Sequence, residues 1–294
     1  MRLDVIGAGP AYTDRPGAIG SSYLLRHDGS SLVLDLGQGT FAGLAGILDP
    51  GTLDAVVISH LHPDHFIDLV ALRHYLRWEQ PRRRVRVIGP VGLADRLDAL
   101  HDEPGFAAAA LDVEALTEGA RVIGSFEVVA RRVRHTDSSY GFRVAPADSA
   151  PDVAGLVYSG DCGHAEDLDA LARPGDTLLC EVSFGPGPII PGPEHLDGPA
   201  VGELARRVKA TRVLLTHIMM GFDRAATIKS VRARFDGPVE LVDPGFENHD
   251  RGLIAHGPRV RGALARMPLA SINVRAGIRT MRAGIRARPP PGTT

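Results

Sequence analysis

Short apolar runs separated by glycine turns dominate the beginning of the chain. The runs at Leu3–Ile6, Tyr23–Leu25 and Leu32–Leu36 have the length and residue types of β-strands. The same pattern predicts later strands at Ala55–Ser59, Val85–Ile88, Phe126–Val129, Gly141–Val144, Leu156–Ser159, Thr177–Cys180 and Arg212–Thr216. We therefore expect strands to form much of the regular structure.

Helical spacing of apolar residues lies between these strands. It predicts one helix over Phe66–Trp78 and a second over Ala165–Ala172. Asp197 is placed to cap a third helix, because Pro199 falls in its first turn and apolar residues follow on one face. Interleaved strands and helices indicate an α/β fold in which two sheets pack together, with helices outside, in a single domain.

The charge of the chain divides it into a body and a tail. Residues 257–294 hold eight arginines and no acid, which leaves 25 basic and 35 acidic residues in 1–256. The tail repeats Arg-Ala-Gly-Ile-Arg and ends in prolines, so we expect it to be disordered, with binding to an anionic surface as the alternative. An acidic body is a poor match for a long polyanion, whose binding depends on phosphate neutralisation.

The amino terminus, the lengths of the apolar stretches and the cysteine content indicate the cellular compartment. Its amino terminus indicates a first strand and not a signal peptide, and no stretch approaches the length of a membrane span. Cys162 and Cys180 give no disulfide framework. We therefore predict a cytoplasmic protein without a membrane partner.

The strongest chemical signal is His60-Leu61-His62-Pro63-Asp64-His65, directly after a predicted strand. Three imidazoles and one carboxylate in six residues are too dense for one tetrahedral ion. They suit two ions about 3.5–4 Å apart, each completed by ligands from elsewhere in the chain.

Three further motifs follow other predicted strands: Asp35-Leu36-Gly37-Gln38-Gly39, Tyr158-Ser159-Gly160-Asp161 and Leu215-Thr216-His217. With the histidine cluster, their order resembles the metallo-β-lactamase superfamily. The stretch from Arg134-His135 to Phe142-Arg143 and the pair Glu194-His195 are similar to its RNase Z-like branch. The resemblance implies a four-layer αββα sandwich over residues 1–256.

The resemblance also implies a ligand set for two divalent metal ions. His60, His62 and His135 would hold one ion, Asp64, His65 and His217 the other, with Asp161 bridging them. Imidazole and carboxylate ligands without thiolate suit Zn²⁺, Mn²⁺ or Fe, and ligand type alone does not choose among them. We expect Zn²⁺, with Mn²⁺ or Fe as alternatives.

Other roles in the site come from the same resemblance. Asp35 would position the metal loop without binding metal, and Asp64 and His195 would be catalytic. His195 would protonate the leaving oxygen or bind the phosphate, and Glu194 or Glu181 would orient it.

We therefore expect a phosphodiesterase that hydrolyses a small phosphodiester, with 3′,5′-cyclic AMP as the leading candidate, by attack of a metal-bound hydroxide. The whole pattern looks closest to the bacterial cyclic-nucleotide phosphodiesterases of this branch. The interval of about 26 residues from His135 to Asp161 leaves no room for the tRNA-gripping arm of RNase Z. An RNase Z-type endoribonuclease that processes tRNA 3′ ends is the disfavoured alternative, and a silent scaffold is a third. A homodimer is a possible assembly.

Overall fold

The computed structural model of the chain describes residues 1–150, 152–192 and 194–249. The described residues belong to one compact unit. The predicted basic tail, residues 257–294, lies outside the described residues, so its disorder stays a prediction. In the described part of the chain, no helix is long and apolar enough to cross a membrane.

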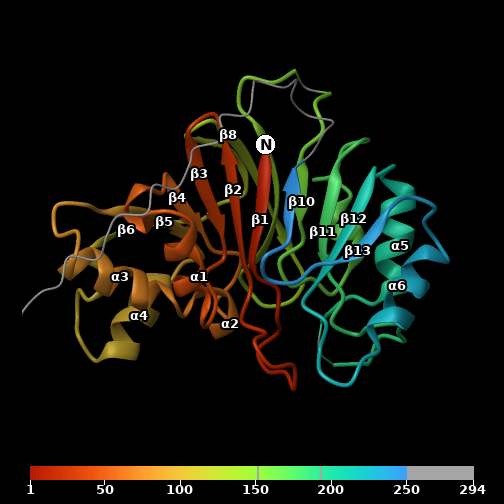
Figure 1. Cartoon of the computed structure of the whole chain (residues 1–294), viewed down its shortest axis with the longest axis horizontal. Helices are drawn as coiled ribbons and strands as arrows, with labels where there is room; N and C mark the ends of the chain where they lie inside the picture. The colour runs from red at the N-terminus through yellow and green to blue at the C-terminus, as the bar shows by residue number, and fades with distance from the viewer. Residues whose placement is uncertain (151, 193, 250–294) are drawn as a thin grey trace, which may run out of the picture. The chain divides into compact units, whose positions relative to one another are not determined.

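Two seven-stranded sheets form the centre of this unit within the described residues (Figure 1). The first contains, in spatial order, β14 (Glu247–His249), β1 (Arg2–Gly7), β2 (Ser22–His27), β3 (Ser30–Leu34), β4 (Ala55–Val57), β5 (Val85–Gly89) and β6 (Leu111–Ala115). The second contains β13 (Val239–Leu241), β12 (Arg212–Thr216), β11 (Thr177–Glu181), β10 (Leu156–Tyr158), β9 (Ser139–Pro146), β8 (Phe126–Val133) and β7 (Gly119–Ile123). In each sheet an antiparallel part continues into a parallel part, β3 to β6 in the first and β10 to β13 in the second.

Helices cover the outer faces of the two sheets (Figure 1). The helices against the first sheet are α1 (Thr40–Ile47), α2 (Pro63–Phe66), α3 (Leu69–Trp78) and α4 (Leu93–His101). Those against the second are α5 (Gly198–Arg207) and α6 (Arg224–Arg232). Short 3₁₀ turns occur at η1 (Pro50–Thr52), η2 (Ala107–Ala109) and η3 (Ala165–Leu168). The predicted four-layer αββα sandwich is confirmed.

Successive side chains of a strand point to opposite faces of its sheet, so they belong alternately to the core between the sheets and to the layer of helices outside. In β3, Leu32 and Leu34 belong to the core between the sheets, whereas Val33 packs with the helices outside the first sheet. In the inter-sheet core the rings of Tyr23 and Tyr158 lie 5.0 Å apart between centroids. Because both faces of these strands are buried, their sequences are nearly continuous apolar runs.

The single helix predicted over Phe66–Trp78 is wrong, because the chain forms α2 and α3 with a break between them. At the break, the backbone N–H of Asp68 donates to the carbonyl of Leu36 at 3.0 Å. The Asp68 carboxylate accepts from the backbone N–H of Phe41 in the first turn of α1 at 2.8 Å. These tertiary hydrogen bonds outweigh continuous helical spacing.

The helix predicted over Ala165–Ala172 is also wrong in extent, since only η3 is helical there. The N–H groups of Leu171 and Ala172 both donate to the carbonyl of Leu168, which closes a turn. Several elements were not predicted at all: α1, α4, α6, β6, β7, β13 and β14. The α1 sequence contains two glycines and little amphipathic pattern, so its local signal is weak.

Candidate metal centre

Seven predicted metal ligands come together where strands of both sheets end. They group into two overlapping clusters, within each of which the possible ligand atoms lie within 4.8 Å of one another. One cluster contains His60, His62, His135 and Asp161, and the other contains Asp64, His65, Asp161 and His217. Asp161 belongs to both clusters, which is the position expected for a bridging carboxylate.

The elements explain this convergence. His60 and His62 follow β4, and Asp64 and His65 lie in α2. His135, Asp161 and His217 follow β8, β10 and β12 respectively. Loops at one edge of two rigid sheets can meet at one point while the strands stay fixed.

Close backbone packing fixes the short helix α2. The backbone N–H of Ser21 donates to the carbonyl of Asp64 at 2.9 Å, and that of Leu36 donates to the carbonyl of His65 at 2.7 Å. A Cβ atom on Gly37 would lie 1.8 Å from the Asp64 carbonyl oxygen. Only glycine therefore allows the loop after β3 to pack against the metal-binding helix.

Asp35 anchors the metal loop through four hydrogen bonds. Its carboxylate accepts from the backbone N–H and the hydroxyl of Ser59 at 2.7 and 2.8 Å, and from Tyr158 Oη at 2.7 Å. It also accepts from His65 Nδ1 at 2.8 Å, which directs His65 Nε2 toward Asp161 Oδ1 at 3.4 Å. Asp35 has a φ of 58°, a left-handed conformation that residues other than glycine rarely adopt. Asp35 thus holds a ligand without reaching the metal position.

Serine hydroxyls set the proton positions of two further imidazoles. The Ser59 hydroxyl donates to Asp35, so it accepts from His60 Nδ1 at 3.1 Å. The Ser183 hydroxyl donates to the carbonyl of His217 at 3.1 Å and accepts from His217 Nδ1 at 3.0 Å. In both rings the Nδ1 proton is engaged outside the site, which leaves the Nε2 lone pair for a metal ion.

The innermost atoms fit divalent cations. His135 Nε2 lies 3.2 Å from His62 Nδ1, and His65 Nε2 lies 3.3 Å from His217 Nε2. His60 Nε2 and Asp161 Oδ1 are buried and have no hydrogen-bond partner in the described protein. Buried polar atoms are nearly always satisfied, and imidazole nitrogens and carboxylates at this spacing are typical ligands of zinc-like ions. The residues therefore fit the metal centre that the sequence predicts.

The electrostatics of the site favour positive charge at its centre. Burial raises the pKa of Asp161, but the imidazoles of His217 and His65 outweigh burial and hold that pKa well below its ordinary value. Burial, and then the charge of His65, lower the pKa of His60, which keeps it neutral. Burial lowers the pKa of His65, yet Asp161 and Asp35 raise it well above its usual value. A divalent ion held by these residues would satisfy the same carboxylates in place of a proton.

His195 lies beside this centre and is held by Glu181. Its Nδ1 donates to Glu181 Oε1 at 2.9 Å, and the Glu181 carboxylate is itself fixed by the backbone N–H groups of Cys162 and Ser183, both at 2.9 Å. No residue in the described part of the chain bonds His195 Nε2. Burial lowers the pKa of His195, and the charge of Glu181 outweighs it and raises that pKa to about 9.

Of the two acids expected to orient His195, the structure places Glu181 there and not Glu194. The side chain of Glu194 is exposed, and its contribution is its main-chain carbonyl, which accepts from His135 Nδ1 at 2.7 Å. This carbonyl holds His135 by its Nδ1, as the serine hydroxyls hold His60 and His217. A main-chain acceptor leaves no trace in side-chain identity, so the sequence could not reveal it.

Two cavities border the site. One, of about 320 Å³, is lined by His62, Arg96 and the loop 136–138, and the other, of about 380 Å³, is lined by His195 with Ile189 and Ile190. Arg96 Nη1 donates to the carbonyl of Leu61 at 2.9 Å, within the histidine motif itself. Arg96 was not predicted from the sequence, because it lies on α4, about 35 residues beyond the motif.

Other supporting residues were missed as well, although they adjoin the motifs. Ser59 precedes His60, and Ser183 follows Glu181 by two positions. A hydroxyl side chain so close in sequence to a predicted site residue was the signal that could have identified them. Cys162 is a buried free thiol, as expected, and its neighbour Asp161 belongs to both His/Asp clusters.

Comparison with known proteins agrees with this geometry. Residues 35–218 match the family model of the beta-lactamase superfamily domain. An uncharacterized protein of Mycobacterium leprae is 35% identical over 253 residues, which cover 83% of this chain and 87% of that protein. The chain belongs to the metallo-β-lactamase superfamily.

Two further relatives define its branch and class. Ribonuclease Z of a Mycobacterium species is 29% identical over 201 residues, 61% of this chain and 67% of that protein. YhfI of Bacillus subtilis, a probable metallo-hydrolase, is 24% identical over 258 residues. The YhfI structure matches with a TM-score of 0.73 and 21% identity, and the match covers 84% of this chain and 98% of YhfI. The predicted RNase Z-like branch is confirmed, and the chain is a metal-dependent hydrolase.

Proposed function

We propose that the chain is a phosphodiesterase that uses two divalent metal ions to hydrolyse a small phosphodiester, with 3′,5′-cyclic AMP as the leading candidate. The observation that carries this proposal is the pair of overlapping His/Asp clusters that share Asp161. Two adjacent cations are the arrangement that suits displacement at a phosphoryl centre.

Each cluster has a set of residues to hold an ion. His60, His62 and His135 would hold one, and Asp64, His65 and His217 the other, with Asp161 shared. Zn²⁺ is the first candidate for this imidazole and carboxylate set. When bound, such ions supply an activated water near neutral pH and neutralise charge on a phosphoryl oxygen.

His195 is the residue placed to serve the leaving group. Glu181 accepts a hydrogen bond of 2.9 Å from His195 Nδ1 and so fixes the ring. Nε2 is therefore the nitrogen left to face a substrate. A proton donated from Nε2 to the leaving oxygen would prevent build-up of alkoxide charge. The ring also lines the cavity with Ile189 and Ile190, which is wide enough for an organic group attached to that oxygen.

A small substrate fits the surroundings better than tRNA does. The interval from His135 to Asp161 contains β9 and β10, which pair with each other inside the second sheet. This interval therefore contains no protruding arm among its described residues, 135–150 and 152–161. The acidic balance of residues 1–256 favours the same conclusion.

The RNase Z alternative has the ribonuclease Z likeness in its favour. The basic segment Arg82-Arg83-Arg84 and the arginine-rich tail are the sequence features that favour RNA binding. Arg83 Nη1 lies 3.4 Å from Asp49 Oδ2, and Arg84 Nε lies 2.6 Å from Asp112 Oδ1. Two of these three charges are thus paired within the protein, which weakens the segment as an RNA-binding surface.

The deciding experiment compares two substrates on one preparation. We expect kcat/KM for cyclic AMP, at physiological salt with Zn²⁺ or Mn²⁺, to exceed that for a 3′-extended pre-tRNA. Bis-p-nitrophenyl phosphate serves as a general diester control, and the Asp161→Ala protein serves as the blank. More efficient cleavage of the pre-tRNA at its 3′ end would overturn the proposal in favour of the ribonuclease.

A further inference from the structure

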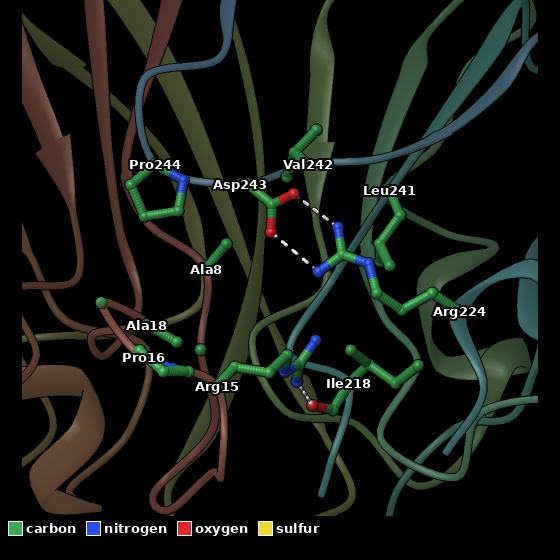
Figure 2. Close-up of a pocket in the computed structure, with 12 residues that line it drawn as sticks. Ala8, Arg15, Pro16, Ala18, Ile218, Arg224, Leu241, Val242, Asp243 and Pro244 are labelled. Atoms are coloured by element: carbon green, nitrogen blue, oxygen red, sulfur yellow. Dashed lines mark hydrogen bonds and ion pairs between the residues drawn. The ribbon is translucent and has the colours of Figure 1, made fainter. Parts of the chain in front are cut away.

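A cavity of about 330 Å³ lies next to the metal centre but outside its ligand set (Figure 2). Its walls come from the loop between β1 and β2, from the start of α6 and from the segment after β13. Ile218, which directly follows His217, also lines it. The cavity therefore begins one residue away from the metal cluster.

Arg15 projects into this cavity from the β1–β2 loop (Figure 2). Its Nη2 donates to the carbonyl of Ile218, and its Nε donates to Thr13 Oγ1 at 3.2 Å. Both acceptors are uncharged. No carboxylate in the described part of the chain forms an ion pair with Arg15, although the charges of Asp243 and Asp14 act on it from farther away and raise its pKa.

Arg224 brings a second guanidinium to the same cavity (Figure 2). It binds Asp243 through two hydrogen bonds of 2.9 and 2.5 Å. Burial, and then the charge of Arg224, lower the pKa of Arg15, which indicates that the two cations lie close enough to repel. The charged residues that line the cavity are thus two arginines and one aspartate, with an excess of one positive charge.

We propose that this cavity binds the phosphate group of a small phosphorylated molecule, with Arg15 as the main contact and Arg224 as the second. A guanidinium presents a planar set of N–H donors that matches phosphate oxygens, and a fixed, unpaired one loses little entropy on binding. Pro16, Ala18, Leu241, Val242 and Pro244 supply apolar surface for the rest of such a molecule. The volume falls in the range of small-ligand pockets, and it suits a group of nucleoside monophosphate size.

The site is independent of the proposed phosphodiesterase activity. Its charge lies on Arg15 and Arg224, neither of which is in the metal clusters. A ligand held there could be a nucleotide or free phosphate, since both carry the group that the arginines would bind. The test therefore separates these two sources.

The experiment measures binding of AMP to the intact metal-loaded protein by equilibrium dialysis. AMP has no diester bond, so it is not consumed. The matched variants are Arg15→Gln and, as control, Arg82→Gln, which removes an exposed arginine far from the cavity in the sequence. We expect Arg15→Gln to lose one equivalent of bound AMP relative to Arg82→Gln, through a weakening of about tenfold or more.

A third variant should change AMP affinity in the opposite direction. Asp243→Asn removes the carboxylate that competes for Arg224, so AMP should bind about threefold more tightly at this site. Damage to the fold would not tighten binding, which makes this variant a safeguard. Displacement of the Arg15-dependent equivalent by inorganic phosphate alone would identify phosphate as sufficient, and displacement only by AMP would show that the apolar walls contribute.

Equal AMP stoichiometry in the Arg15→Gln and Arg82→Gln proteins would overturn the proposal. So would binding of adenosine as tight as that of AMP, because the arginines would then not be recognising phosphate. Failure of the chain to hydrolyse cyclic AMP would leave this site intact if AMP binding still depends on Arg15, so the two proposals fail separately.

Discussion

The two halves of the metal centre differ in how they are built. Asp64, His65 and His217 are 3%, 0% and 3% exposed, whereas in the other half His62 is exposed and His135 is partly buried, although His60 is 0% exposed. The buried half is held by carboxylate and hydroxyl partners inside the protein. In the open half the Ser59 hydroxyl holds His60, but the support for His135 among the described residues is one main-chain carbonyl.

This difference indicates that the two halves bind their ions with different affinities. A buried, densely hydrogen-bonded half can hold an ion tightly, because its ligands are already oriented before the ion arrives. The open half borders the cavity that His62 lines, so His62 is exposed to exchange with water. We therefore expect the two ions to differ in affinity, with the ion of the open half more readily lost.

The largest effect should come from the residue that both halves share. Asp161→Ala removes the bridging carboxylate, so both ions should be lost or displaced. His195→Ala should lower kcat by roughly 10²–10⁴-fold with metal content unchanged, because only leaving-group assistance is lost. Diesterase turnover and elemental analysis of both proteins test the order. Near-normal turnover and metal content in Asp161→Ala would refute the shared site.

A smaller effect is expected at the support of the buried half. Asp35→Asn keeps the size of the side chain but removes its charge and one acceptor oxygen from the Ser59, Tyr158 and His65 network. Metal affinity should fall about 10–100-fold, as it does when such supporting carboxylates are changed. Titration with a competing chelator measures it, with Asp137→Asn, an exposed acid near the open half, as the control. Equal affinities in the two variants would mean that Asp35 has no such role.

A buried ion pair outside the metal clusters allows the stability of the fold to be tested separately from metal binding. Arg143 and Asp176 are 2% and 0% exposed and are joined by bonds of 2.8 and 2.9 Å. Asp176→Ala leaves the Arg143 charge buried without its partner, which should lower the free energy of unfolding by about 3–5 kcal/mol. Denaturant unfolding measures the loss. The fraction that stays folded should keep its full metal content, and a loss of metal there would show coupling between the two regions.

The smallest effect is expected from the basic tail. Removal of residues 257–294 should leave turnover of a small diester nearly unchanged, because arginine, glycine and proline offer little apolar surface to bury. The melting temperature and kcat/KM of the truncated protein test this. A large fall in either would show that the tail packs on the body.

The sequence predicted the ligand positions better than the supports around them. His60, His62, Asp64 and His65 form a dense motif after a strand, and such a motif carries its chemistry in side-chain identity. The break between α2 and α3 could not be read in this way, since it depends on Asp68 bonding to residues about 27 positions earlier in the chain. The support of His135 by the Glu194 carbonyl likewise depends on tertiary contact alone.

Metal content tests the two-part centre most directly. Protein purified without chelator should contain about two equivalents of divalent metal per chain, and His62→Ala should retain about one, because it removes a ligand only from the open half. Elemental analysis measures the metal content of both proteins. A reproducible single equivalent in the fully active unmodified protein would contradict a centre with two ions.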